Sequence, residues 1–230
     1  MVLAADGTRG DVHPFLALAV LLRARGAEVL VCAPPDFEAD ARERGVPYRS
    51  VGAPVRAYLE QQAAAVHGTT ADVIRAGRAF IETSLPLQMA GMAEAARGAD
   101  VVLGASTQAA AASAAELHGC RHRFVAYAPG VIPADDVAPF TVPWPRLRGL
   151  PARAAWWLTR RLANTMLRGP LCRERAKLGL PPVGDVFDHF VGERGRVVEG
   201  MQAADRLHGH ARGASTSPSS AARRGASPTK

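Results

Sequence analysis

The chain has 230 residues, 48% of them hydrophobic, so it is long and apolar enough to form one large domain with a buried core. It shows neither a secretory signal pattern nor an apolar run of the roughly 18 residues that cross a membrane. The net charge of +7 does not indicate a specific nucleic-acid partner, because residues 201–230 alone hold five basic residues against one acidic residue.

The first fifty residues alternate between strand and helix signals. An apolar run at residues 2–5 predicts a strand, and the sequence GTRGDVHP follows it as a glycine-rich turn. A helical period then extends to residue 25, in a helix expected to open at His13 and Pro14. The next expected elements are a strand at residues 28–32, a short helix at 35–44 and a strand at 46–50.

The same alternation continues to residue 127. The expected elements are helices at residues 56–66 and 70–97, the second kinked or broken at Pro86, a strand at 100–104, an alanine-rich helix at 108–117 and a strand at 123–127. Regular alternation of strands and helices is typical of an α/β fold. We therefore predict a Rossmann-like, mainly parallel sheet with helices on both faces.

The last hundred residues lose this pattern. Six prolines between residues 128 and 151 indicate an irregular segment, and residues 152–178 predict a helix that Gly169-Pro170 could split. Residues 211–230 contain no large apolar side chain and cannot bury enough surface to offset the entropy of ordering. We divide the chain into a folded domain at residues 1–200 and a disordered, basic, Ser/Pro-rich tail at residues 201–230.

Asp11 and His13 are the first candidates for chemistry. In an open α/β sheet, ligands bind at the carboxyl ends of the strands, where the turn after residues 2–5 lies. A carboxylate there could accept the proton of a substrate hydroxyl, and an aspartate at a helix start could equally stabilise the helix end. His13 could be the base, a substrate contact or an ordinary residue of the first helical turn. Gly7 and Gly10 allow a ligand to approach the backbone closely.

Other chemistries find less support. Ser106, Thr107 and Gln108 follow the fourth strand and could bind a substrate, although we favour a helix cap. The turn lacks GxGxxG, and no acidic residue ends the second strand, which disfavours a nucleotide-dependent oxidoreductase. The Cys and His residues show no metal-ligand spacing, so no metal is expected. The three cysteines are expected to be free thiols in a reducing cytoplasm.

The motif GTRGDVHPFLALA at residues 7–19 resembles the opening of the GT-B glycosyltransferases. It is most similar to the family 28 N-terminal domain, which sterol glucosyltransferases share with the glycosyltransferases of vancomycin-type aglycones. Stretches at residues 25–37, 45–48, 100–104 and 127–129 fit the same family. The combination is specific, and it covers most of the chain up to about residue 195. The fold that it implies is the N-terminal half of a GT-B enzyme.

The resemblance implies inverting hexosyl transfer from a nucleotide sugar to a hydroxyl group, without a cofactor or a metal. Asp11 aligns with the family's proposed catalytic base. In relatives of the plant type a histidine serves as the base, and it aligns with Asp11 rather than with His13. The positions expected to contact substrate are Gly7, Thr8, Arg9, Gly10, His13, Ser106, Thr107 and Gln108.

The expected acceptor is a hydrophobic small molecule such as a lipid, a sterol or a secondary metabolite, because the loops at residues 51–68 and 130–150 are apolar and rich in proline. Contact with a membrane is expected to be peripheral at most. The roughly thirty residues after position 200 are too few for the family's second, donor-binding domain. The resemblance therefore implies a truncated enzyme, inactive unless a partner chain supplies the donor half. The alternative is a non-catalytic acceptor-binding or helper subunit of a separate glycosyltransferase.

Overall fold

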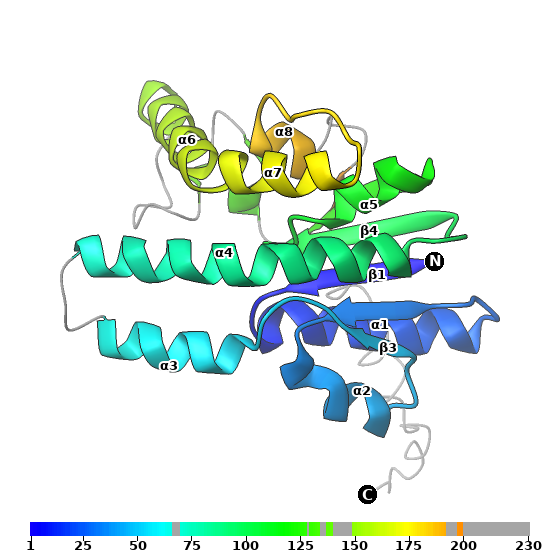
Figure 1. The fold of residues 1–230 in the computed structure, drawn as a ribbon. Helices are drawn as coiled ribbons and strands as arrows, with labels where there is room; N and C mark the ends of the chain where they lie inside the picture. The colour runs from blue at the N-terminus through cyan, green and yellow to red at the C-terminus, as the bar shows by residue number, and fades with distance from the viewer. Residues whose placement is uncertain (66–69, 128, 134–136, 140–148, 192–196, 200–230) are drawn as a thin grey trace, which may run out of the picture.

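The fold centres on a parallel β-sheet (Figure 1). The computed structural model describes residues 1–65, 70–127, 129–133, 137–139, 149–191 and 197–199. Within these residues the sheet has six strands in the order β3-β2-β1-β4-β5-β6, and every pair of neighbours is parallel. The strands are β1 (Val2–Asp6), β2 (Leu30–Ala33), β3 (Tyr48–Ser50), β4 (Val101–Ser106), β5 (Arg121–Ala126) and β6 (Val197–Glu199).

Helices connect the strands and follow them. They are α1 (Arg9–Ala24), the 3₁₀ turn Pro35–Phe37, α2 (Glu38–Glu43), α3 (Val55–Ala65), α4 (Thr70–Ala95), α5 (Ala111–His118), the 3₁₀ turn Pro129–Val131, α6 (Leu150–Ala163), the π-helical turn Asn164–Arg168, α7 (Gly169–Lys177) and α8 (Val186–Val191). Among the described helices, none is long and apolar enough to cross a membrane.

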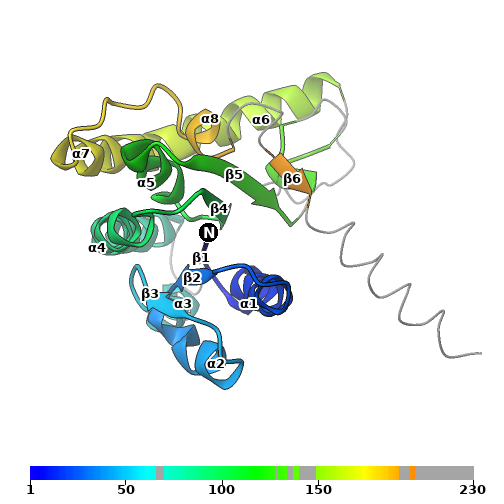
Figure 2. The same ribbon diagram turned by 90° about the vertical axis from the view of Figure 1, so that its right-hand side faces the viewer.

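The core is divided into two layers by the sheet, as the end-on view of Figure 2 shows. On one face α1 and the 3₁₀ turn before α2 bury Val12, Phe15, Leu16 and Phe37 against Leu3 and Ala5 of β1. On the other face α4, α5 and α7 pack against Val2 and Ala4. Successive side chains of a strand point to opposite faces, so the fully buried β1 supplies both layers.

The predicted architecture is confirmed, with helices on both faces of a parallel sheet. The predicted opening of the first helix at His13 is wrong, because α1 begins at Arg9. Thr8 is the N-cap, and its N–H donates to Asp11, which satisfies a donor at the helix start. Of the predicted kink or break at Pro86, the break is wrong, since Pro86 lies inside α4. The strand β6 and helix α8 were not predicted, and the tail at residues 201–230 lies outside the described residues.

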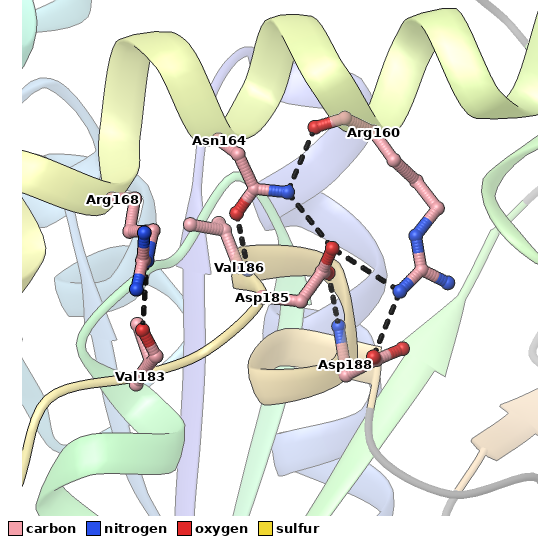
Figure 3. Close-up of polar contacts among 7 residues, drawn as sticks. All are labelled: Arg160, Asn164, Arg168, Val183, Asp185, Val186 and Asp188. Atoms are coloured by element: carbon pink, nitrogen blue, oxygen red, sulfur yellow. Dashed lines mark hydrogen bonds and ion pairs between the residues drawn. The ribbon is translucent and has the colours of Figure 1, made fainter.

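The helix predicted at residues 152–178 is divided into α6, the π-helical turn and α7, which follow one another without a gap, and α7 begins at Gly169, where the split was expected. The side chain of Asn164 ties this turn to the segment before α8 (Figure 3). Its Nδ2 donates to Oδ2 of Asp185 at 2.8 Å, and its Oδ1 accepts the N–H of Val186 at 3.0 Å. Arg160 forms ion pairs with Asp185 and Asp188 at 3.1 and 2.8 Å.

Candidate active site

Asp11 lies at the carboxyl end of β1, in the first turn of α1. Its Oδ2 accepts the N–H of Thr8 at 2.7 Å and the hydroxyl of Thr8 at 3.2 Å. Its Oδ1 accepts the hydroxyl of Ser106, the last residue of β4. The first-turn position also favours the negative charge, because the N–H groups of the helix point toward it. The carboxylate is therefore held from two strand ends and stays partly exposed.

The turn before Asp11 requires a glycine. Gly7 has a φ of +137°, which lies in a region that residues with a side chain rarely adopt. A Cβ placed on Gly7 would lie 2.8 Å from Cγ of Asp11, closer than two carbon atoms approach without a bond. The absence of a side chain at this position thus lets the carboxylate fold back against the turn.

Ser106 and Thr107 do not cap the next helix, so the cap that the sequence favoured is wrong. The helix α5 begins at Ala111, and its N-cap is Ala110, whose side chain makes no capping hydrogen bond. The Ser106 hydroxyl donates to Asp11 instead, and the Thr107 hydroxyl donates to the carbonyl oxygen of Asp6 at 3.1 Å. The Ser106 hydroxyl therefore joins the end of β4 to α1, and the Thr107 hydroxyl joins the residue after β4 to the end of β1. Gln108 is buried, and its Oε1 accepts the N–H of Ala110 at 3.0 Å.

His13 points away from this cluster toward α2. Its Nε2 lies 2.8 Å from Oδ2 of Asp40, and its ring meets that of Phe37 edge-on. Arg9 and Gly10 are exposed in the first turn of α1. The structure thus brings Gly7, Thr8, Asp11 and Ser106 together, whereas the polar partner of His13 lies on another helix. The substrate contacts expected of these residues stay predictions.

Asp6 is a second carboxyl group beside the first, and sequence reasoning missed it. It is the last residue of β1, 4% exposed, and its Oδ2 accepts Nε2 of Gln88 at 2.8 Å. Burial raises the pKa of Asp6 to about 7, the charge of Asp11 adds to the rise, and hydrogen bonds from Gln88 and Thr107 oppose it. A polar residue directly after an apolar run was the available signal, whereas nothing in the local sequence marks Gln88.

Tyr127, one residue beyond β5, is the other group that sequence reasoning missed. Its ring packs edge-on against Phe15 of α1. Burial raises the pKa of the Tyr127 hydroxyl, and the negative charge of Asp11 adds to this effect. Among the described residues, three buried polar side-chain atoms have no hydrogen-bond partner, and they belong to Asp6 (Oδ1), Gln108 (Nε2) and Tyr127 (the hydroxyl).

The carboxyl ends of β1, β4 and β5 thus carry a partly exposed carboxylate, hydroxyl groups and a buried acid. This arrangement can accept a proton from a hydroxyl group that approaches Asp11. The described residues contain no group of three His, Cys, Asp or Glu side chains that could hold a metal ion. The described side chains at this edge offer a base with hydrogen-bonding neighbours.

Residues 1–119 match the model of the glycosyltransferase family 28 N-terminal domain. The chain belongs to this family. The relatives of this chain include glycosyltransferase GtfE of Amycolatopsis orientalis, which is 36% identical over 198 residues. These residues are 82% of this chain and 46% of that protein. The vancomycin aglycone glucosyltransferase of the same organism is 33% identical over 191 residues, 81% of this chain and 45% of that protein.

Solved structures support the same fold. Glycosyltransferase VinC in complex with dTDP has a TM-score of 0.52 at 16% identity, over 83% of this chain and 46% of that one. The calicheamicin glycosyltransferase CalG4 has a TM-score of 0.52 at 16% identity, over 85% of this chain and 46% of that one. The family 28 chain thus has the Rossmann-like fold of one half of a GT-B glycosyltransferase, and it spans slightly less than half the length of these relatives.

Proposed function

We propose that this chain is the acceptor-binding half of an inverting glycosyltransferase in which Asp11 is the catalytic base. The observation that carries the proposal is the Asp11 carboxylate at the carboxyl end of β1, fixed by Thr8 and Ser106 and still partly exposed. In sheets of this kind that edge is where ligands bind. Membership of the family and relatives named as glycosyltransferases support hexosyl transfer as the reaction.

The proposed reaction is a single displacement at the anomeric carbon of a nucleotide sugar. The acceptor hydroxyl gives its proton to an oxygen of Asp11, and the electron pair of its O–H bond forms the new bond to the anomeric carbon. The bond from that carbon to the diphosphate oxygen breaks, and its electrons leave with the nucleoside diphosphate. Attack opposite the leaving group inverts the anomeric centre. The Ser106 and Thr8 hydrogen bonds hold the carboxylate in place during this transfer.

The proposed acceptor is a hydrophobic small molecule. Gln88 of α4 contacts Asp6 at the end of β1, so the part of α4 before Gln88 extends past the carboxyl ends of the strands, with α3 beside it (Figure 1). There Tyr58 of α3 stacks on Phe80 of α4, with ring centres 4.2 Å apart. Aromatic surfaces with a few polar groups suit an apolar ligand. A relative named for the vancomycin aglycone supports this class of acceptor.

The test is glycosyl transfer by the chain joined to the C-terminal half of glycosyltransferase GtfE. Release of the nucleoside diphosphate is measured with UDP and dTDP sugars and a panel of hydrophobic aglycones. Asp11→Asn is expected to lower kcat by about 10²- to 10⁴-fold, the usual contribution of a general base. The matched control is Asp100→Asn, which neutralises an exposed carboxylate next to the amino end of β4. Full activity of Asp11→Asn would refute the assignment of the base.

The same assay tests the proposal that this half has no transferase activity without a donor-binding half. The chain alone should bind the aglycone without turnover, and turnover by the chain alone would refute the proposal. A non-catalytic role in acceptor binding is the second candidate, because the contacts of Asp11 with Thr8 are also those of an aspartate that stabilises a helix start. Under that alternative, Asp11→Asn would lower the stability of the joined enzyme and leave its kcat unchanged.

A further inference from the structure

Ser106 adopts a backbone conformation that needs support. Its φ is +56°, and it is the only described residue other than glycine with a positive φ. Such a conformation is unfavourable for a residue with a Cβ and persists only where the surroundings enforce it. Ser106 is also the residue whose hydroxyl holds Oδ1 of Asp11. Whatever maintains this turn therefore also positions the proposed base.

The turn after Ser106 is held by two contacts that converge on Asp6. The hydroxyl of Thr107 donates to the carbonyl oxygen of Asp6 at 3.1 Å and lies 3.4 Å from its Oδ2. The N–H of Ala109 donates to Oε1 of Gln88 at 3.3 Å, and Nε2 of Gln88 donates to Oδ2 of Asp6 at 2.8 Å. Asp6 thus contacts the turn directly, mainly through its carbonyl oxygen, and its carboxyl group contacts the turn through Gln88.

The environment of Asp6 favours the neutral acid. The residue is 4% exposed, and its Oδ1 has no hydrogen-bond partner among the described residues. The groups that face it are Gln88 from α4, Thr107 after β4 and Asp11 from α1, and of these only Asp11 carries a charge. An ionised Asp6 would therefore be a second negative charge, buried without a cation.

We propose that Asp6 is a positioning residue for Asp11 that clamps Thr107 and Gln88 and thereby holds Ser106 in its left-handed conformation. In this arrangement one carboxyl group is the base and the other supports it, and the site carries a single negative charge at a pH below the pKa of Asp6, where Asp6 is the neutral acid. The inference rests on the proposed function, because positioning of Asp11 affects the reaction only if Asp11 is the base.

The charge state of Asp6 can be measured on the unmodified 230-residue chain. Carboxyl ¹³C NMR is expected to show Asp6 titrating near pH 7, about three units above an ordinary aspartate, as its burial beside Asp11 requires. A midpoint near pH 4 would overturn the neutral-acid part of the proposal. This measurement needs no variant and does not depend on whether the chain has transferase activity.

The clamp is tested by the backbone chemical shifts of Ser106 and its HN–Hα coupling, which report the sign of φ. Asp6→Ala removes the carboxyl contacts and keeps the carbonyl oxygen that Thr107 contacts, so it is expected to weaken the left-handed signature of Ser106. Asp6→Asn, which mimics the neutral acid, is expected to retain the signature. The control Asp100→Asn should leave it unchanged. If Asp6→Ala does not fold, Thr107→Val removes one arm of the clamp at nearly constant shape and should weaken the same signature. Retention of the signature in both Asp6→Ala and Thr107→Val would overturn the proposal.

The experiments distinguish a failure of Asp11 as the base from a failure of Asp6 as the positioning residue. If Asp11→Asn keeps full transferase activity while Asp6→Ala releases Ser106, the clamp exists and Asp11 is not the base. If Asp11→Asn abolishes transfer and Asp6→Ala leaves Ser106 in place, the base is correct and the role of Asp6 is refuted. In the joined enzyme, Asp6→Ala should lower kcat, and Asp6→Asn should restore most of the loss at neutral pH. Equal losses in both variants would contradict the clamp.

Discussion

The hydroxyl of Ser106 donates a hydrogen bond to Oδ1 of Asp11, although 95 residues separate the two in the chain. The parallel pairing of β1 with β4 makes this contact, because Asp6 lies opposite Ser106 in the register. Each strand of a parallel sheet ends at the same edge, so residues from distant segments meet there. The proposed base is thus held by the sheet as a whole and not by its own turn alone.

The left-handed conformation of Ser106 predicts an unusual order of stability between two variants. Ser106→Ala loses the hydrogen bond to Asp11 and keeps the unfavourable φ, whereas Ser106→Gly loses the bond and relieves the strain. Relief of about 1–2 kcal/mol exceeds the roughly 0.4–1 kcal/mol that glycine costs through the unfolded chain. Urea unfolding should therefore show Ser106→Gly to be the more stable variant. The opposite order would mean that Ser106 is not left-handed in solution.

Gly7 should be intolerant of a side chain for two separate reasons. Gly7→Ala combines an unfavourable φ of +137° with a Cβ that would press on Asp11, and we expect a loss of about 1–3 kcal/mol in unfolding free energy. Gly26→Ala is the control, since Gly26 has a φ of +84° and a Cβ there would meet nothing within 4 Å. Gly7→Ala should also lower transfer by the joined enzyme, and Gly26→Ala should not. Equal effects on activity would contradict the packing of Asp11 against Gly7.

Local sequence patterns predicted the fold well because strands and helices depend on nearby residues. The apolar run of β1, the glycine turn and the periodic α1 are all readable within twenty residues. The hydroxyl of Ser106 was misread as a cap, since a serine between a strand and a helix looks the same in either role. The partnership of Asp6 with Gln88, 82 residues apart, leaves no local signal. Contacts across the sheet edge had to be seen in the structure.

Asp6 should make the protein less stable as the pH rises. Its pKa in the folded state is about 7 against 3.8 for an ordinary aspartate, so the folded state binds the proton more tightly. The stability that this proton binding contributes is fully present below pH 4 and is lost as the pH rises to 7. The pKa difference corresponds to a loss of up to roughly 4 kcal/mol in unfolding free energy. Asp6→Asn should therefore be more stable than the unmodified chain at pH 8. Thermal unfolding at pH 5 and pH 8 measures this, and equal differences at both values would contradict it.

His189 should have the opposite effect on the pH dependence of stability, because it should make the protein less stable as the pH falls. Burial, with the nearby charge of Arg175, lowers the pKa of His189 to about 4, from 6.5 in the unfolded chain. The unfolded state then binds the extra proton, so stability is complete above pH 6.5 and is lost as the pH falls toward 4. His189→Gln should flatten the acid side of the stability profile and leave the alkaline side as it is. A changed slope above pH 7 would point to another group.

Arg173 and Arg175 lie on the same helix, and each forms two hydrogen bonds with a glutamate of another helix. Their surroundings differ, because the Arg173 side chain is 59% exposed and that of Arg175 only 2%. Arg175 also donates to the Pro181 carbonyl at 2.9 Å and to the Ser113 hydroxyl at 2.9 Å. Arg175→Met should therefore cost about 3 kcal/mol or more of unfolding free energy, since it removes a buried guanidinium that donates to the Pro181 carbonyl and to the buried Ser113 hydroxyl.

Arg173→Met removes a pair of the same chemistry at the surface and should cost less than about 1 kcal/mol. Urea unfolding of both variants at low and high salt separates the two cases. Salt should weaken only the Arg173 contribution, because exposed charges are screened and buried ones are not. Glu116 is 41% exposed, so water can solvate its carboxylate after Arg175 is replaced. Glu116→Gln should accordingly cost much less than Arg175→Met, and equal costs would place the stabilisation in the ion pair and not in the buried hydrogen bonds.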